Sequence, residues 1–170
     1  MIISPFEGID NSFVSKLYYY YDGITDIQVE PMRLSTRSRY AIRALLDLAM
    51  HIGEGPTLVR EIAEREDISV RYLEQLLLPL KAAGIVRATR GANGGFTLAK
   101  EPSAINLREV IQVMEGSTAF TECADDTGIC PRTNTCVLRD SWVEITDAAN
   151  KVMEATSLQV MVDRQNLKSK

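Results

Sequence analysis

Apolar residues recur at helical spacing along most of the chain after residue 31. From Ser35 to His51 they form a broad apolar face, and Ser35 or Thr36 stands where a capping residue is needed. Residues 53–56 contain two glycines and a proline, which end a helix. The pattern therefore predicts a first long helix that ends near His51.

Two shorter helices are predicted next. Thr57 is expected to cap a helix over residues 58–65, and Ser69 to cap a helix over residues 70–83 that Gly84 closes. The turn between them is short, so the two helices must cross steeply and pack through apolar side chains. We expect these side chains to be Ile62, Ile68, Leu73 and Leu76.

Two strands are predicted over residues 85–89 and 96–99, joined by a glycine-rich turn over residues 90–95. Helix, short helix, tight turn, helix and two-stranded ribbon is the order of a winged helix-turn-helix. The predicted fold class is therefore mainly α, a winged helix-turn-helix with a small two-stranded β wing and a long C-terminal helix.

The remainder of the chain alternates regular and irregular segments. Asn106 is expected to cap a helix over residues 107–115, and residues 117–135 have no regular pattern. A long amphipathic helix follows over residues 137–155, with Leu138, Trp142, Ile145, Ala149 and Val152 on one side. Ser157 then caps a last short helix over residues 158–163 or slightly beyond.

The first 31 residues differ from the rest, with clustered tyrosines, several acids and weak periodicity. We interpret them as an extension that is not native, with Met32 as the natural start; the alternative is a genuine extension that packs through its tyrosines. The predicted organisation is the extension 1–31, a winged helix-turn-helix domain 32–102, a linking helix and cysteine loop 103–136, and the long helix with its tail 137–170.

The formal net charge of −4 hides an uneven distribution. Residues 33–100 carry a net +4, whereas residues 1–32 and 101–170 each carry −4. A local basic segment is what a phosphate backbone attracts. The alternative, a solvated charged face, is common on any soluble domain.

The predicted third helix exposes polar side chains in its first turns. They can hydrogen-bond to base edges or phosphates, and Arg90 in the wing turn can enter a minor groove. The alternatives are that Arg71 and Glu74 form only a surface pair and that Gly94 and Gly95 form only a hairpin turn. The candidate DNA-binding residues are Ser69, Arg71, Tyr72, Glu74, Gln75 and Arg90.

The chain's three cysteines fall in one short stretch, spaced Cys123-x6-Cys130-x5-Cys136. Clustered cysteines in a cytosolic chain indicate a metal or redox site rather than disulfides, and thiolates suit zinc and iron–sulfur clusters. Structural zinc usually takes four protein ligands, so three thiolates favour a labile cluster. We interpret His51, the single histidine, as a helix-end residue. Oxygen ligands from nearby acids, or free thiols without metal, remain open.

Other classes of protein fit poorly. No apolar run is long enough to span a bilayer and no secretory signal is present, so we expect a cytoplasmic protein without a membrane partner. We do not expect an enzyme, because no nucleophile and base pair stands out. The wing glycines also lie between two strands, which is the wrong context for a nucleotide site.

Residues 32–165 resemble the IscR/NsrR-type family of winged-helix iron–sulfur transcription regulators. The resemblance rests on these stretches: Met32-Arg-Leu-Ser-Thr, Arg39-Tyr40-Ala41, Tyr72-Leu73-Glu74-Gln75-Leu76, Arg90-Gly91 with Gly94-Gly95-Phe96, Cys130-Pro131-Arg132, and Cys136 to Trp142. It implies a homodimer in which the helix after Cys136 is the dimerisation helix and crosses its partner's copy. It also implies a palindromic operator in double-stranded DNA.

By position, the resemblance places the five polar residues of the third helix on the recognition helix and Arg90 in the minor groove. It makes Cys123, Cys130 and Cys136 the ligands of an iron–sulfur cluster, which we expect to be 2Fe-2S rather than 4Fe-4S. Loss of the cluster by oxidation, nitric oxide or iron shortage would change the affinity for DNA.

Two departures from the family pattern concern the fourth ligand. Arg139 stands where relatives carry a ligand histidine, and Arg39 stands where others carry an acidic ligand. The first cysteine gap is also one residue longer than the common one. The alternatives are a thiol-redox or small-ligand-sensing regulator without a cluster, or a structural zinc-binding interaction module.

Overall fold

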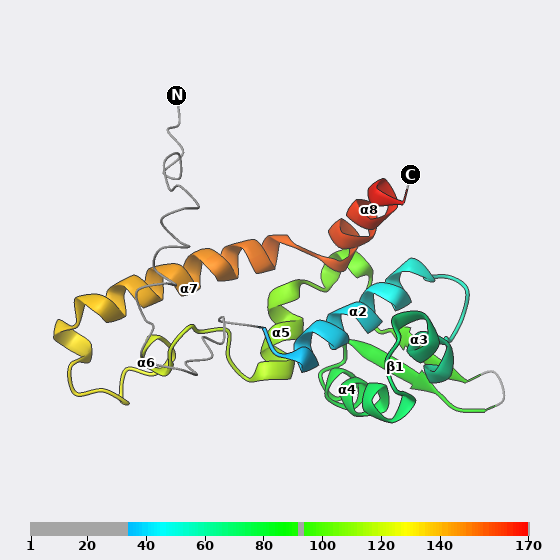
Figure 1. Cartoon of the computed structure of the whole chain (residues 1–170), viewed down its shortest axis with the longest axis horizontal. Helices are drawn as coiled ribbons and strands as arrows, with labels where there is room; N and C mark the ends of the chain where they lie inside the picture. The colour runs from blue at the N-terminus through cyan, green and yellow to red at the C-terminus, as the bar shows by residue number, and fades with distance from the viewer. Residues whose placement is uncertain (1–33, 92–93, 170) are drawn as a thin grey trace, which may run out of the picture. The chain divides into compact units, whose positions relative to one another are not determined.

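The computed structural model describes residues 34–91 and 94–169 (Figure 1). The predicted extension 1–31 and the expected start at Met32 lie outside these residues. The helices and strands run in the order α2 (Thr36–Met50), α3 (Val59–Glu66), α4 (Val70–Ala82), β1 (Val86–Thr89), β2 (Gly95–Leu98), α5 (Leu107–Glu115), α6 (Glu122–Asp125), α7 (Val137–Ala155) and α8 (Leu158–Lys168).

Four predicted capping residues begin their helices as expected. The hydroxyl of Ser35 accepts the amide of Ser38 at 3.1 Å, and the hydroxyl of Ser69 accepts the amide of Tyr72 at 3.3 Å. The side chains of Asn106 and Ser157 do the same for α5 and α8. Each cap satisfies an amide that the first helical turn leaves without a partner.

The prediction that Thr57 caps α3 is wrong. Leu58 is the capping position, and its amide donates to the carboxylate of Glu61 at 3.3 Å. Thr57 is buried and pairs with Phe96 through two backbone hydrogen bonds, of 2.9 and 2.8 Å. Thr57 therefore extends the wing as a one-residue antiparallel bridge instead of capping the helix.

The core lies around α2, α3 and α4. Ile62, Ile68, Leu73 and Leu76 are all buried, as predicted. Asp67, at φ 51°, makes the sharp turn after α3, and the amide of Ile68 then donates to Ala63 at 2.9 Å. The helix-turn-helix is thus fixed by its own apolar contacts and turn geometry.

The C-terminal segment returns to this core. The amide of Leu158 donates to Ile105 at 2.9 Å, the amide of Leu107 donates to Thr156 at 3.0 Å, and the Leu158 side chain is fully buried. Helix α8 packs on α2 and extends to Lys168, beyond the predicted end. The two ends of α7 are therefore anchored differently, since its C-terminal end joins the core and its N-terminal end carries the cysteine loop.

Along α7 itself, Thr146 is buried, and four apolar side chains are exposed. They are Val137, Leu138, Ile145 and Val152. Of the apolar side predicted for this helix, Leu138, Ile145 and Val152 are therefore exposed in the single chain, whereas Trp142 and Ala149 are half-buried.

Candidate nucleic-acid interface and cysteine loop

Helix α4 presents a polar face to solvent and an apolar face to the core. Ser69, Arg71, Glu74 and Gln75 are exposed, whereas Leu73, Leu76, Leu77 and Leu80 are buried. Among the described residues, Arg71 and Glu74 form no ion pair with each other. The exposed candidates therefore stand together, at the first turns of the helix, where a recognition helix contacts bases.

Tyr72, the fifth candidate of this helix, is half-buried. Its ring meets the ring of Tyr40 edge to face, with centroids 6.1 Å apart, and the Arg43 guanidinium lies 5.3 Å from the Tyr40 centroid. Helix α2 therefore holds the Tyr72 ring in place, a contact that the sequence pattern does not reveal.

Two ion pairs fix the short turn that precedes α4. Arg43 donates to the carboxylate of Glu66 at 2.7 Å and to its carbonyl at 2.6 Å. Arg65 donates to both oxygens of Asp47, at 2.6 and 2.8 Å, and this hydrogen bonding raises the pKa of Arg65. Sequence reasoning missed this second pair, although a lone carboxylate within the apolar face of the first helix was its signal.

The wing is an antiparallel hairpin in which Val86 pairs with Leu98 and Thr89 with Gly95. Arg90 follows β1 and is exposed. The wing residues Ala92 and Asn93 lie outside the described chain. A Cβ atom on Gly95 would stand 2.3 Å from the Thr57 carbonyl oxygen, so this glycine has a structural role, whatever else it contacts.

The three cysteines are free thiols and half-buried. Cys123 lies in α6, Cys130 lies in the irregular segment, and Cys136 immediately precedes α7. Two contacts tie the Cys123 region to α7: Arg139 Nε donates to the Cys123 carbonyl at 2.8 Å, and the amide of Phe120 donates to Thr146 at 3.2 Å.

These thiols fit an iron–sulfur cluster in donor type, but they do not meet at one point. Within residues 34–91 and 94–169, no three Cys, His, Asp or Glu side chains stand close enough to hold a metal ion. Arg139 is occupied by the Cys123 backbone, and Arg39 donates to Thr36 at 3.1 Å. His51 contacts the carbonyl of Asp47 at 2.8 Å, which agrees with its interpretation as a helix-end residue.

Polar contacts also join the end of α5, just before the cysteine loop, to the start of α2. The hydroxyls of Ser35 and Ser38, at the start of α2, donate to the carboxylate of Glu115, the last residue of α5. Burial acts to raise the pKa of Glu115, but the two serine hydrogen bonds outweigh it and leave that pKa lowered.

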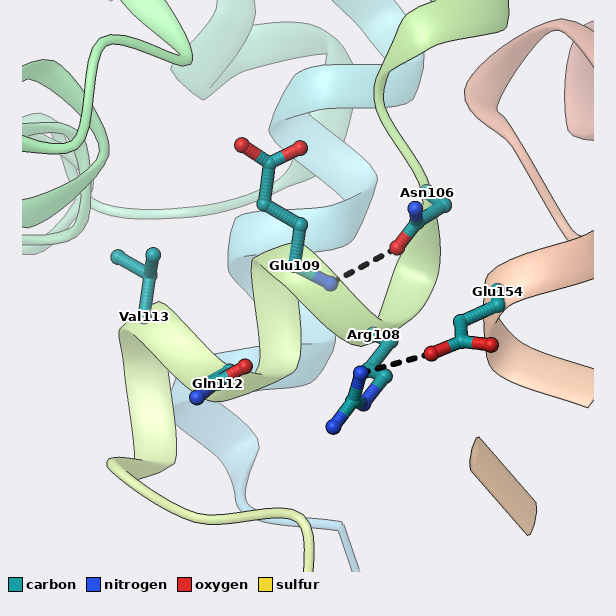
Figure 2. Close-up of a pocket in the computed structure, with 6 residues that line it drawn as sticks. All are labelled: Asn106, Arg108, Glu109, Gln112, Val113 and Glu154. Carbon is teal, nitrogen blue, oxygen red and sulfur yellow. Dashed lines mark hydrogen bonds and ion pairs between the residues drawn. The ribbon is translucent and has the colours of Figure 1, made fainter. Parts of the chain in front are cut away.

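Helices α5 and α7 meet at a polar seam (Figure 2). Arg108 of α5 donates to Glu154 of α7 at 2.7 Å, beside a hollow of about 220 Å³. The Nε atom of Arg108 and the Oδ1 atom of Asn150 are buried without partners in the described structure. Polar contacts therefore hold the last turns of α7 to α5, beside the half-buried Met153 that packs against the core.

Comparison with known proteins identifies the family to which the winged helix-turn-helix and the cysteine loop belong. Residues 34–164 match the Rrf2 family, described as an iron-dependent transcriptional regulator. The chain is 40% identical over 127 residues to protein rrf2 of Nitratidesulfovibrio vulgaris, covering 75% of this chain and 85% of that protein.

Solved structures give the same result. The chain matches CymR, the global cysteine regulator of B. subtilis, with a TM-score of 0.66 and 35% identity over 78% of this chain and 98% of that one. It matches IscR of T. potens with a TM-score of 0.66 and 35% identity over 79% of this chain and 89% of that one.

The chain belongs to the Rrf2 family of winged-helix, DNA-binding transcription regulators. This confirms the predicted fold class and the predicted resemblance, and these relatives are regulators rather than enzymes. None of the helices in the described ranges has the length and apolarity that a bilayer crossing requires.

Proposed function

We propose that the protein binds a palindromic site in double-stranded DNA as a homodimer. The observation that carries this proposal is the exposed polar face at the first turns of α4, held on a rigid frame beside the wing. Arg71 suits guanine, Gln75 suits adenine and Glu74 suits the amino group of cytosine. Ser69 and Tyr72 suit phosphates, and Arg90 suits the adjoining minor groove.

The second copy is expected on α7. Leu138, Ile145 and Val152 are exposed and seven residues apart, so they lie along one face of the helix. Packing this face against its own copy removes apolar surface from water on both chains. A twofold-symmetric dimer presents two copies of α4 to half-sites about one helical turn apart.

Selection of duplexes from a random pool tests the DNA-reading part. We expect the enriched sequences to be inverted repeats. Arg71→Ala relaxes the preference at one position of each half-site, by about 1–3 kcal/mol for a lost bidentate contact. Arg164→Ala on α8, exposed and remote in sequence, is the control. If the selection enriches no particular sequence, sequence-specific DNA binding is contradicted.

For regulation, the proposal assigns Cys123, Cys130 and Cys136 as the ligands of an iron–sulfur cluster, 2Fe-2S in preference to 4Fe-4S. When bound, such a cluster supplies an oxidation-sensitive link between the three thiolates. The chain's own residues contribute contacts that connect the cysteine loop to the neighbouring helices. Arg139 and Thr146 hold the Cys123 region to α7, and Glu115 holds the end of α5, from which the loop segment starts, to α2. A change in the order of the loop therefore acts on both the dimer helix and the first helix of the DNA-binding domain.

The test is an ultraviolet–visible spectrum of protein purified without oxygen, with iron and sulfide counted on the same sample. Visible charge-transfer bands with matching iron and sulfide support the cluster, and we expect Cys130→Ala to abolish them together with cluster-dependent DNA binding. A Cys130→Ala protein that still switches its DNA affinity would refute cluster sensing and leave DNA binding intact.

A thiol regulator without a cluster is the second candidate. Two observations favour it: the described residues gather no three ligands, and the expected histidine position holds an arginine that binds the chain's own backbone. Under this alternative, the purified protein is colourless and resists cluster reconstitution. Its affinity for DNA then follows added oxidant and is restored by thiol reductant.

A further inference from the structure

A groove of about 510 Å³ runs between the start of α3 and the wing. One wall consists of residues 58–60, and the other consists of residues 88, 89, 91 and 94–96. In Figure 1, α3 lies beside the β1–β2 hairpin, and the backbone pairing of Thr57 with Phe96 joins the two. This groove is separate from the exposed face of α4 described above.

The backbone sets the width of the groove. Thr57 and Phe96 exchange two hydrogen bonds, and Gly95 lies so close to Thr57 that a Cβ atom would stand 2.3 Å from its carbonyl oxygen. A Cβ atom on Gly94 would stand 2.4 Å from the carbonyl oxygen of Thr89. These two glycines therefore let the wing backbone pack closely against Thr57 and Thr89, and this packing fixes the wing wall of the groove.

The charge beside the groove is positive and not neutralised. Arg60 is exposed and has no hydrogen-bonded or ion-paired partner among the described residues. Its neighbour Glu61 is turned back to the Leu58 amide. Arg90, between the lining residues Thr89 and Gly91, is exposed in the same way.

Three other arginines of this domain are already engaged. Arg43 binds Glu66, Arg65 binds Asp47, and Arg87 donates to the carbonyl of Ala99 at 2.7 Å. Arg60 and Arg90, like Arg37 and Arg71, have no hydrogen-bonded or ion-paired partner within the described chain, and they differ from those two in lying at the groove. An anionic ligand that passes along the wing would supply one.

We propose that this groove seats one strand of the DNA sugar–phosphate backbone and that Arg60 contacts a phosphate there. The inference rests on the proposed DNA binding and adds a site to it. The groove is open at the surface and its wing wall includes Gly91, next to Arg90, which suits an extended polyanion. A contact of this kind carries no sequence information but fixes the position of α4 in the adjoining major groove.

The salt dependence of binding to a labelled duplex of arbitrary sequence tests the proposal with the full-length protein. A lost phosphate contact lowers the slope of log affinity against log salt by about 0.9 per chain. We therefore expect Arg60→Ala to bind about five- to tenfold more weakly per chain near 0.1 M salt, which is about 25- to 100-fold for a dimer that makes the contact twice, and to converge with the unaltered protein near 1 M. Arg60→Lys keeps the charge and is expected to retain most of the slope.

Arg164→Ala is the matched control, because it removes an exposed arginine on α8, away from the groove in sequence. Melting curves of all variants establish that each is folded, and Arg60→Gln replaces Arg60→Ala if the latter melts early. Equal affinity and slope for Arg60→Ala and the unaltered protein would overturn the groove assignment. An equal loss in Arg164→Ala would also overturn it. Absence of duplex binding by the unaltered protein at any salt would instead overturn the proposed function.

Discussion

Asp47 keeps only 4% of its surface exposed and is paired with Arg65 through both carboxylate oxygens. Taking away one partner of such a pair leaves a buried charge without compensation. We expect Arg65→Ala to lower the free energy of unfolding by about 2–4 kcal/mol, because Asp47 then stays buried and unpaired. Urea unfolding followed by circular dichroism measures this loss.

The double variant Asp47→Ala/Arg65→Ala supplies the control for this pair. Removing both partners is expected to cost less than the sum of the two single substitutions, since no unpaired charge remains. Strict additivity of the two losses would show that the pair does not act as a unit.

The lowered pKa of Glu115 makes the free energy of unfolding depend on pH and sets the direction of that dependence. A carboxylate with a lowered pKa in the folded state stabilises that state above the ordinary glutamate pKa, and the contribution is lost as the pH falls through the lowered value. We expect Glu115→Gln to be less stable than the unaltered protein near neutral pH, and the difference to disappear in acid.

Urea midpoints measured from neutral to acidic pH test this prediction. Glu144→Gln, an exposed glutamate of α7 for which no hydrogen bond or ion pair is found in the described chain, is the matched control. A constant difference between Glu115→Gln and the unaltered protein across this range would contradict the assigned role of the carboxylate.

At the scale of elements, the sequence pattern predicts the hairpin, four helix caps and the helices other than α6, because apolar spacing and capping chemistry are local properties. The four-residue helix α6 lies in the segment 117–135 for which no regular structure is predicted, and it buries no residue that could give an apolar pattern. It does not predict that Thr57 pairs with Phe96, since this contact depends on where a segment distant in sequence passes. The candidate residues of α4 follow from helical spacing alone. The engagement of Arg139 by the Cys123 backbone depends on how the irregular segment folds back, and no local pattern encodes it.

That contact leads to a prediction about the cysteine loop. In Arg139→Ala, the α6 segment loses its hydrogen bond to α7. We expect faster hydrogen exchange confined to residues 120–125, with the melting temperature changed little because the apolar core is intact. Arg132→Ala, an exposed arginine of the same loop, is the control. Unchanged exchange in residues 120–125 would mean that other contacts, such as that of Phe120 with Thr146, hold the segment alone.

On the scale of the whole molecule, the placement of α7 explains how one chain combines a stable DNA-binding unit with an adjustable one. Its C-terminal end is joined to the core through Thr156 and Leu158, and its last turn meets α5 through the Arg108–Glu154 ion pair. An exposed ion pair contributes little to stability, so the position of α7 over α5 is only weakly fixed by the single chain. A second copy packed along the exposed face would restrain it.

The oligomeric state tests this view directly. Placing glutamate at both Leu138 and Val152 buries two charges in the proposed interface, so we expect the double variant to sediment as a monomer at concentrations at which the unaltered protein sediments as a dimer. The core of each chain does not involve these side chains, which are 62% and 67% exposed, and the melting curve of the separated chain therefore remains cooperative. Lys151→Glu changes the charge on another face of α7 and is expected to leave the dimer intact. Dimeric behaviour of the double variant would exclude this face as the contact between copies.

The monomer also has a consequence for DNA binding. Because a single α4 reaches one half-site, we expect the monomeric variant to bind an inverted repeat no better than an isolated half-site.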